Sequence, residues 1–139
     1  MADRQNWNRS IIEEFRANGG KVGGMWEGRP LLLLTTTGAK SGQRRTNPTM
    51  YLREGDRLLI FASRGGAPTN PDWYHNLLAH PHVTVEVGSE TYDAVATVLS
   101  GEERDRLYAR QAQLFPQFAD YQTRTTRKIP VIALVRQKG

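Results

Sequence analysis

The stretch Val83-Thr84-Val85-Glu86-Val87-Gly88-Ser89 alternates apolar and polar residues and then reaches a Gly-Ser pair. Alternation with a period of two is typical of a strand with one buried face, and the Gly-Ser pair predicts a turn into a second strand over 91–99. Similar runs predict four more strands, at 29–37, 46–53, 57–63 and 129–135. Six strands with short turns and no regular strand–helix alternation favour an α+β fold, a six-stranded antiparallel barrel with flanking helices.

The first 20 residues are predicted to hold an amphipathic helix, from about 7 to 17, that ends at two glycines. This helix has two interpretations. Flanked by arginines, its apolar face could lie on an anionic membrane and bring the protein to lipid-soluble molecules, or it could dock over the barrel. We favour docking, because most amphipathic helices in globular domains cover a core. The face consists of Trp7, Ile11, Ile12 and Phe15.

Two further helices are predicted from their start signals. Asn70 as a cap and Pro71 at the first position indicate one helix. Ser100 and Glu103 form a capping-box pattern at the start of another, which we expect to break at Pro116. One stripe of this last helix holds Leu107, Gln111, Leu114 and Phe118.

Length and composition restrict the class of protein. A chain of 139 residues is long enough for one compact domain, so we expect residues 1–139 to form a single domain. The net charge of +5 indicates an anionic partner. The chain has no cysteine, and its longest apolar run is far too short to span a membrane. We therefore expect a cytoplasmic protein, with peripheral membrane contact through the N-terminal helix as the alternative.

Two glycine-rich segments carry the chemistry. The segment 38–48 begins at one glycine, contains a second and ends at a proline, and it holds three cations and two hydroxyl groups. This composition is suited to binding phosphate or carboxylate oxygens. It is not a Walker P-loop, because Lys40 lies between the glycines rather than directly after the second. The segment 62–67 repeats this composition with Ser63, Arg64 and two glycines, so both segments could bind parts of one ligand.

Together with 31–37, 70–77 and 127–131, these segments resemble the deazaflavin-dependent nitroreductase family, whose members bind the 8-hydroxy-5-deazaflavin coenzyme F420. The resemblance spans most of the chain and implies a split β-barrel related to flavin-binding reductases. It also supplies an anion for the basic segment, because F420 carries a phosphodiester and an oligoglutamate arm. By motif position the cofactor-binding residues would be Lys40, Ser41, Gly42, Arg44, Arg45, Asn47, Pro48, Met50, Ala62, Ser63, Arg64, Gly65, Trp73 and Asn76.

The resemblance implies hydride transfer from the reduced deazaflavin to an electron-poor acceptor, such as a quinone or a nitro compound. We expect Ser63 and Tyr121 to hydrogen-bond the acceptor oxygens that gain charge. Phe115, Phe118 and Tyr121 are expected to line the acceptor pocket, which would then suit a flat apolar quinone better than a bulky nitroimidazole. The alternative is that these rings only pack on the barrel.

Other interpretations remain at this point. An FMN-dependent oxidoreductase could share the fold, and a small basic barrel could bind single-stranded nucleic acid. Nucleic acid is disfavoured, because the basic residues cluster in turns rather than along a strand face with aromatic residues between them. His80 and His82 are expected to be solvated turn residues rather than metal ligands, so no metal is predicted. The physiological acceptor and the oligomeric state are left open.

Overall fold

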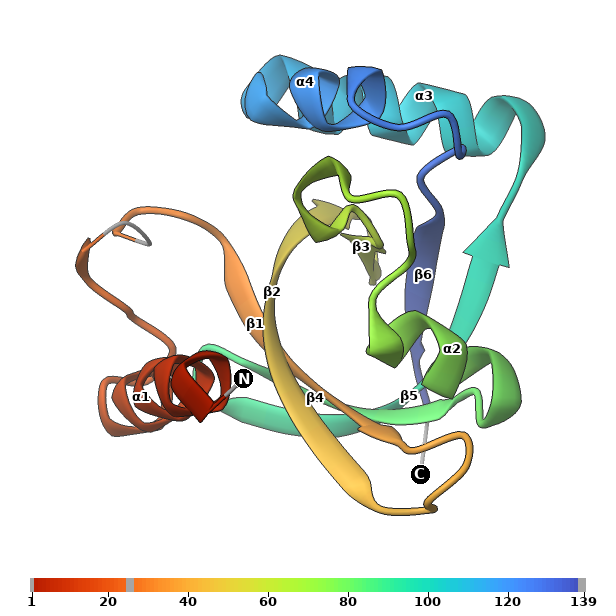
Figure 1. The fold of residues 1–139 in the computed structure, drawn as a ribbon. Coiled ribbons are helices and arrows are strands. Elements are labelled where there is room, and N and C mark those ends of the chain that lie inside the picture. The colour runs from red at the N-terminus through yellow and green to blue at the C-terminus, as the bar shows by residue number, and fades with distance from the viewer. Residues whose placement is uncertain (1, 25–26, 138–139) are drawn as a thin grey trace.

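The computed structural model describes residues 2–24 and 27–137. Its six strands form a closed barrel in the order β1-β2-β3-β6-β5-β4, and every neighbouring pair is antiparallel. The prediction of a six-stranded antiparallel barrel with flanking helices is confirmed (Figure 1). The strands are β1 (Leu31–Thr37), β2 (Arg44–Glu54), β3 (Arg57–Phe61), β4 (His82–Val87), β5 (Glu90–Leu99) and β6 (Val131–Arg136).

The barrel interior is filled by one of the two hydrophobic clusters of the fold. Alternate residues of the strands point inward, and α2 (Asp72–Ala79) adds Trp73 and Leu77 to the same cluster. A small barrel filled in this way has no room for a ligand inside, so a ligand must bind outside the interior. Interior side chains include Leu32, Leu34, Ile60, Val85, Ile132 and Leu134.

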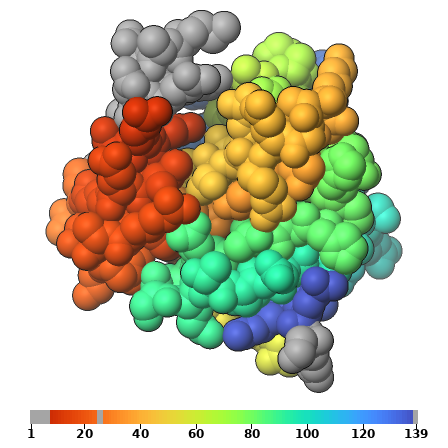
Figure 2. Space-filling model, turned by 90° about the horizontal axis from the view of Figure 1, so that it is seen from below, coloured from red at the N-terminus to blue at the C-terminus, as the bar shows by residue number. Residues whose placement is uncertain are grey.

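The N-terminal helix α1 (Ala2–Ala17) docks on the outside of the barrel. Ile11 and Phe15 are buried in the second hydrophobic cluster, which includes residues of β1 and β2. Arg16 donates two hydrogen bonds to the carboxylate of Glu86, at 2.9 and 2.8 Å. Figure 2 shows the described part of α1 (red-orange) seated beside the green strands. The side chain of Trp7 lies outside the described residues.

Helices α3 (Gly101–Leu114) and α4 (Gln117–Thr123) cover another part of the barrel, with the predicted break at Pro116 between them. Here Phe118 packs edge-on against Phe61, with 5.6 Å between ring centroids. Leu114 was expected on the buried stripe and is instead 55% exposed. The chain becomes extended at Phe115, so the ring of Phe115 packs on the cluster in place of Leu114.

Neither of the two predicted helix caps forms the expected side-chain hydrogen bond. The N-cap residues of α2 and α3 are Pro71 and Ser100, and neither makes a side-chain capping bond. Asn70 instead accepts a hydrogen bond from Arg127, and Glu103 forms an ion pair with Arg57 at 2.7 Å. Tertiary partners therefore compete successfully with the local caps.

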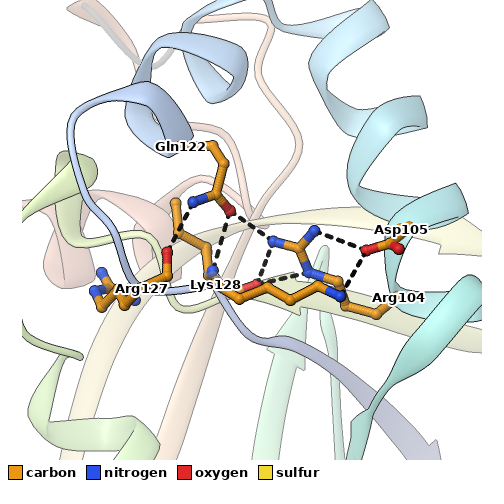
Figure 3. A network of polar contacts seen from close by, with 6 residues as sticks. Arg104, Asp105, Gln122, Arg127 and Lys128 are labelled. Atoms are coloured by element: carbon orange, nitrogen blue, oxygen red, sulfur yellow. Dashed lines mark hydrogen bonds and ion pairs between the residues drawn. The ribbon is translucent and has the colours of Figure 1, made fainter.

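A polar network ties α3, α4 and the segment before β6 together (Figure 3). The Arg104 guanidinium donates two hydrogen bonds to the Ile129 carbonyl and one to Gln122 Oε1. Gln122 in turn donates to the Arg127 carbonyl at 2.8 Å, and Asp105 pairs with Arg104 at 3.1 Å. The network fixes the backbone immediately after Arg127.

Candidate functional site

The loop between β1 and β2 is a compact turn that presents cations to solvent. The Gly38 N–H donates to the Gln43 carbonyl at 2.7 Å, and the Gly42 N–H donates back to the Gly38 carbonyl at 3.0 Å. Gly42 takes a positive φ of +71°, which glycine adopts without strain. The Ser41 hydroxyl faces into the loop and accepts the Gln43 N–H, whereas Lys40 is exposed and makes no ion pair with any described residue.

Asn76 on α2 fixes this loop. Its Oδ1 accepts the Ala39 N–H at 3.0 Å, and its Nδ2 donates to the Thr36 hydroxyl at 3.1 Å. Both ends of the amide are therefore engaged within the protein. Asn76 is predicted from the sequence as a cofactor contact, and in the structure its polar atoms position the loop.

Arg44 and Arg45 point in opposite directions, because β2 begins at Arg44 and successive strand residues alternate between faces. Arg44 turns to the outer face, where it donates to the Thr37 hydroxyl at 3.0 Å and to the Thr84 hydroxyl at 2.6 Å. Arg45 is exposed on the other face, where the one described side chain to which it donates is Gln43, at 3.4 Å. The structure thus keeps Arg45 with the loop and separates Arg44 from it.

One edge of β2 stays open beyond the loop. The register of β2 with β1 covers 44–50, whereas its register with β3 covers only 51–54. Asn47 and Pro48 project to opposite faces of this segment, and Met50 shares the outer face with Pro48 and is buried. A single ligand can contact all three only by lying along the open edge.

The turn after β3 has an unusual backbone. Ser63 is right-handed, whereas Arg64, Gly65 and Gly66 have φ values of +47°, +63° and +83°. A residue other than glycine at positive φ is uncommon and occurs often at functional sites. Gly66 is required sterically, because a Cβ there would lie 2.7 Å from the Tyr121 carbonyl oxygen.

Three successive N–H groups of this turn have no hydrogen-bond partner among the described residues. Within residues 2–24 and 27–137, no hydrogen bond involves the N–H of Ser63, Arg64 or Gly65. A right-handed residue followed by a left-handed one directs such groups into a common concavity that binds electron-rich atoms. The Arg64 side chain is held aside by Thr69, at 2.8 Å.

Arg127 supports this turn from behind, a role that no residue pattern in the sequence predicts. Its guanidinium donates to the carbonyls of Ala62, Ser63 and Ala67 at 3.1, 2.8 and 3.0 Å, and to Asn70 Oδ1 at 2.6 Å. Burial lowers the pKa of the Arg127 guanidinium from its ordinary value, since the cation has lost hydration. The only signal in the sequence was its place at the start of the 127–131 segment.

The aromatic residues predicted for the site divide into buried and partly exposed ones. Trp73 and Phe118 are buried in the two hydrophobic clusters, at 8% and 4% exposure. Phe115 and Tyr121 pack only partly on the core, and the ring centroid of Tyr121 lies 5.2 Å from that of Phe118. Since the Tyr121 carbonyl also adjoins Gly66, α4 lies directly beside the turn.

The site therefore offers exposed cations on one loop, free N–H donors on a turn, and an open strand edge between them. In Figure 1 the β1–β2 loop lies below α2 and the turn lies above it. This donor set fits a long ligand that has an anionic arm and a flat ring with carbonyl oxygens. Among the described residues, no group of three side chains could hold a metal, and no helix could span a membrane.

Comparisons with known proteins specify the family. The profile of the F420H2-dependent quinone reductase family matches residues 7–136. An F420H2-dependent quinone reductase of Mycobacterium tuberculosis is 42% identical over 129 residues, which cover 88% of this chain and 85% of that protein. The solved structure of an F420H2-dependent reductase, FDR-A, is 43% identical with a TM-score of 0.70, over 76% of this chain and 94% of that one.

A second solved structure, described as a domain-swapped dimer, is 38% identical with a TM-score of 0.72 and covers 96% of this chain and 98% of its own. The chain belongs to the F420H2-dependent quinone reductase family. It is therefore an oxidoreductase whose cofactor is coenzyme F420, as the sequence resemblance implied.

Proposed function

We propose that Lys40 and Arg45 bind the anionic arm of F420, and that the 62–65 turn binds its ring, so that a quinone approaches beside α4. The observation that carries this assignment is the pairing of two exposed cations without ion pairs to described residues, at one end of the open β2 edge, with N–H groups near the other end that have no partner among the described residues. When bound, the reduced deazaflavin supplies a hydride from C5. The protein binds and orients the cofactor and the acceptor.

The polar residues of the site have distinct tasks. Lys40 and Arg45 neutralise phosphate or carboxylate oxygens, and Gly42 lets the loop backbone approach them closely. Asn76 keeps the loop in shape. Arg44 contributes little to cofactor binding, because its guanidinium already donates to the Thr37 and Thr84 hydroxyls on the outer face.

The acceptor is proposed to contact the exposed parts of Phe115 and Tyr121. The Tyr121 hydroxyl makes no hydrogen bond to any described residue, so it is available to an acceptor oxygen that gains charge. Ser63 is half-buried in the neighbouring turn and offers a second hydroxyl. A largely apolar lining with two hydroxyls favours a flat quinone over a bulky nitroimidazole, a preference measurable with menadione and a bicyclic nitroimidazole at equal concentrations.

Fluorescence titration with F420 and with FMN tests the cofactor assignment. F420 should bind more tightly than FMN, and Lys40→Ala or Arg45→Ala should weaken F420 binding by about 1.5–3 kcal/mol each, the usual worth of a hydrogen bond to a charged group. Turnover at saturating F420 should be largely retained. Arg44→Ala is the matched control, with the same loss of charge one residue away but on the opposite face. Equal losses in all three variants would show that only net charge matters.

We also propose that α1 acts as a docked part of the fold in a cytoplasmic protein. The burial of Ile11 and Phe15 in the barrel cluster supports this proposal, because a membrane-bound helix would have to release them. Sedimentation with anionic phospholipid vesicles should leave the protein in the supernatant at physiological salt. Quantitative co-sedimentation that survives raised salt would favour the membrane interpretation.

A further inference from the structure

We propose that Arg127 is a positioning residue that keeps the N–H groups of Ser63 and Arg64 turned toward the bound cofactor. The proposal rests on the assignment of the 62–65 turn to the F420 ring. It goes further by explaining why the N–H groups of this turn point outward. It assigns their orientation to a residue more than sixty positions away in the sequence.

The contacts of Arg127 are unusual for a charged side chain. Three of its four acceptors are backbone carbonyls and the fourth is the amide oxygen of Asn70. Arg127 is partly buried and makes no ion pair with a carboxylate in the described part of the chain, whereas the buried Arg104 pairs with Asp105. A guanidinium that is partly desolvated without a counter-ion is expensive for stability, so it is retained where fixed geometry or positive charge is useful.

Peptide geometry links these contacts to the free donors. The Ala62 carbonyl belongs to the same planar unit as the Ser63 N–H, and the Ser63 carbonyl belongs to the same unit as the Arg64 N–H. No peptide bond of the described chain is cis, so carbonyl and N–H point in opposite directions within each unit. Because Arg127 draws both carbonyls toward itself, both N–H groups must point away from it.

The two donors therefore form an aligned pair of the kind that binds a carbonyl oxygen carrying extra charge. The uncompensated positive charge of Arg127 behind the turn adds to their field. The ligand chemistry that fits is an electron-rich carbonyl oxygen on a flat ring, which the pyrimidine part of a deazaflavin provides. Without Arg127 the Ala62 carbonyl loses its side-chain donor and the Ser63 carbonyl keeps only the Gly66 N–H, at 2.9 Å, so the two N–H groups are held less firmly in a common direction.

The test compares Arg127→Met with Arg104→Met, a matched control. Both variants remove a guanidinium that donates to backbone carbonyls, but only Arg127 contacts the turn. We expect both to lower the unfolding temperature. Arg127→Met should also raise the Kd for F420 about tenfold or more, whereas Arg104→Met should change it less than about twofold. Equal Kd values for the two variants would overturn the proposal.

Two further measurements keep the test decisive if Arg127→Met folds poorly. Arg127→Lys retains the positive charge but lacks the planar guanidinium that donates to several carbonyls at once. This variant should still bind F420 several-fold more weakly than the unmodified protein. In the unmodified protein, the amide proton signals of Ser63 and Arg64 should move on addition of F420. Unmoved signals, or full affinity in Arg127→Lys, would refute the positioning role. Lys40→Ala separates the two proposals, since its loss of affinity would persist if only the role of Arg127 is wrong.

Discussion

Replacement of Gln111 by methionine should stabilise the fold. Gln111 is completely buried on α3, and neither its Nε2 nor its Oε1 has a hydrogen-bond partner within residues 2–24 and 27–137. A buried polar group without a partner costs about 1–3 kcal/mol, because it has lost its hydrogen bonds to water. Methionine has a similar size and helix propensity and carries no strong polar group, so Gln111→Met removes this penalty without a large change in packing.

The expected gain is about 1–3 kcal/mol in the free energy of unfolding. For a domain of this length, this corresponds to a rise of about 3–5 °C in Tm for each kcal/mol. Urea unfolding followed by circular dichroism would measure the midpoint and slope, and an unchanged slope would show that stability alone has changed.

Gln113→Met is the matched control, because Gln113 is exposed on the same helix. There the same substitution should change stability by less than about 0.5 kcal/mol. A less stable Gln111→Met variant would refute the reasoning, since it would mean that an internal water satisfies the amide and is lost with it.

Three other changes have clear expected outcomes. Gly66→Ala should lower the free energy of unfolding by about 2 kcal/mol or more in urea titrations, because alanine resists the positive φ and its Cβ would meet the Tyr121 carbonyl. Arg106 and Arg57 hold the pKa of Glu54 at about 2, below its ordinary 4.5, so these contacts stabilise the fold above pH 4.5 and are lost as the pH falls toward 2. Glu54→Gln should therefore flatten the dependence of the urea midpoint on pH across that interval. Tyr121→Phe should lower turnover with menadione about two- to tenfold and leave Tm unchanged; identical rates would remove Tyr121 from the site.

The strands and the hairpin turn at Gly88 were accessible from the sequence, because alternation with a period of two is a local property, whereas the placement of β6 between β3 and β5 was not predicted. The hairpin around Gly88 shows this most clearly, since β4 and β5 lie within a residue or two of their predicted bounds. The bounds of β2 were less accurate. Its start at Arg44, two residues earlier than expected, is what separates Arg44 from Arg45.

The helix caps show where local reasoning fails. Asn70 is of the right residue type for a cap, yet the N-cap of α2 is Pro71, one residue later, and the Asn70 amide oxygen accepts a hydrogen bond from the distant Arg127. The sequence identified both glycine-rich segments but not Arg127, because the acceptors that define its role are carbonyl oxygens. Every residue carries a carbonyl, so no residue pattern reveals which ones an arginine will contact.

The open edge of β2 supports the same function from a different direction. An exposed strand edge is a liability, because it can pair with a strand of another molecule, and proteins commonly guard such edges with charged residues and proline. The part of β2 that pairs with β1 but not with β3 carries Arg45 near its start and Pro48 in its middle. Both residue types disfavour pairing with a further strand. The same two residues admit a flat anionic ligand, since an arginine attracts it and a proline offers an apolar surface. We therefore propose that the same features keep another strand away from this edge and leave it accessible to the cofactor.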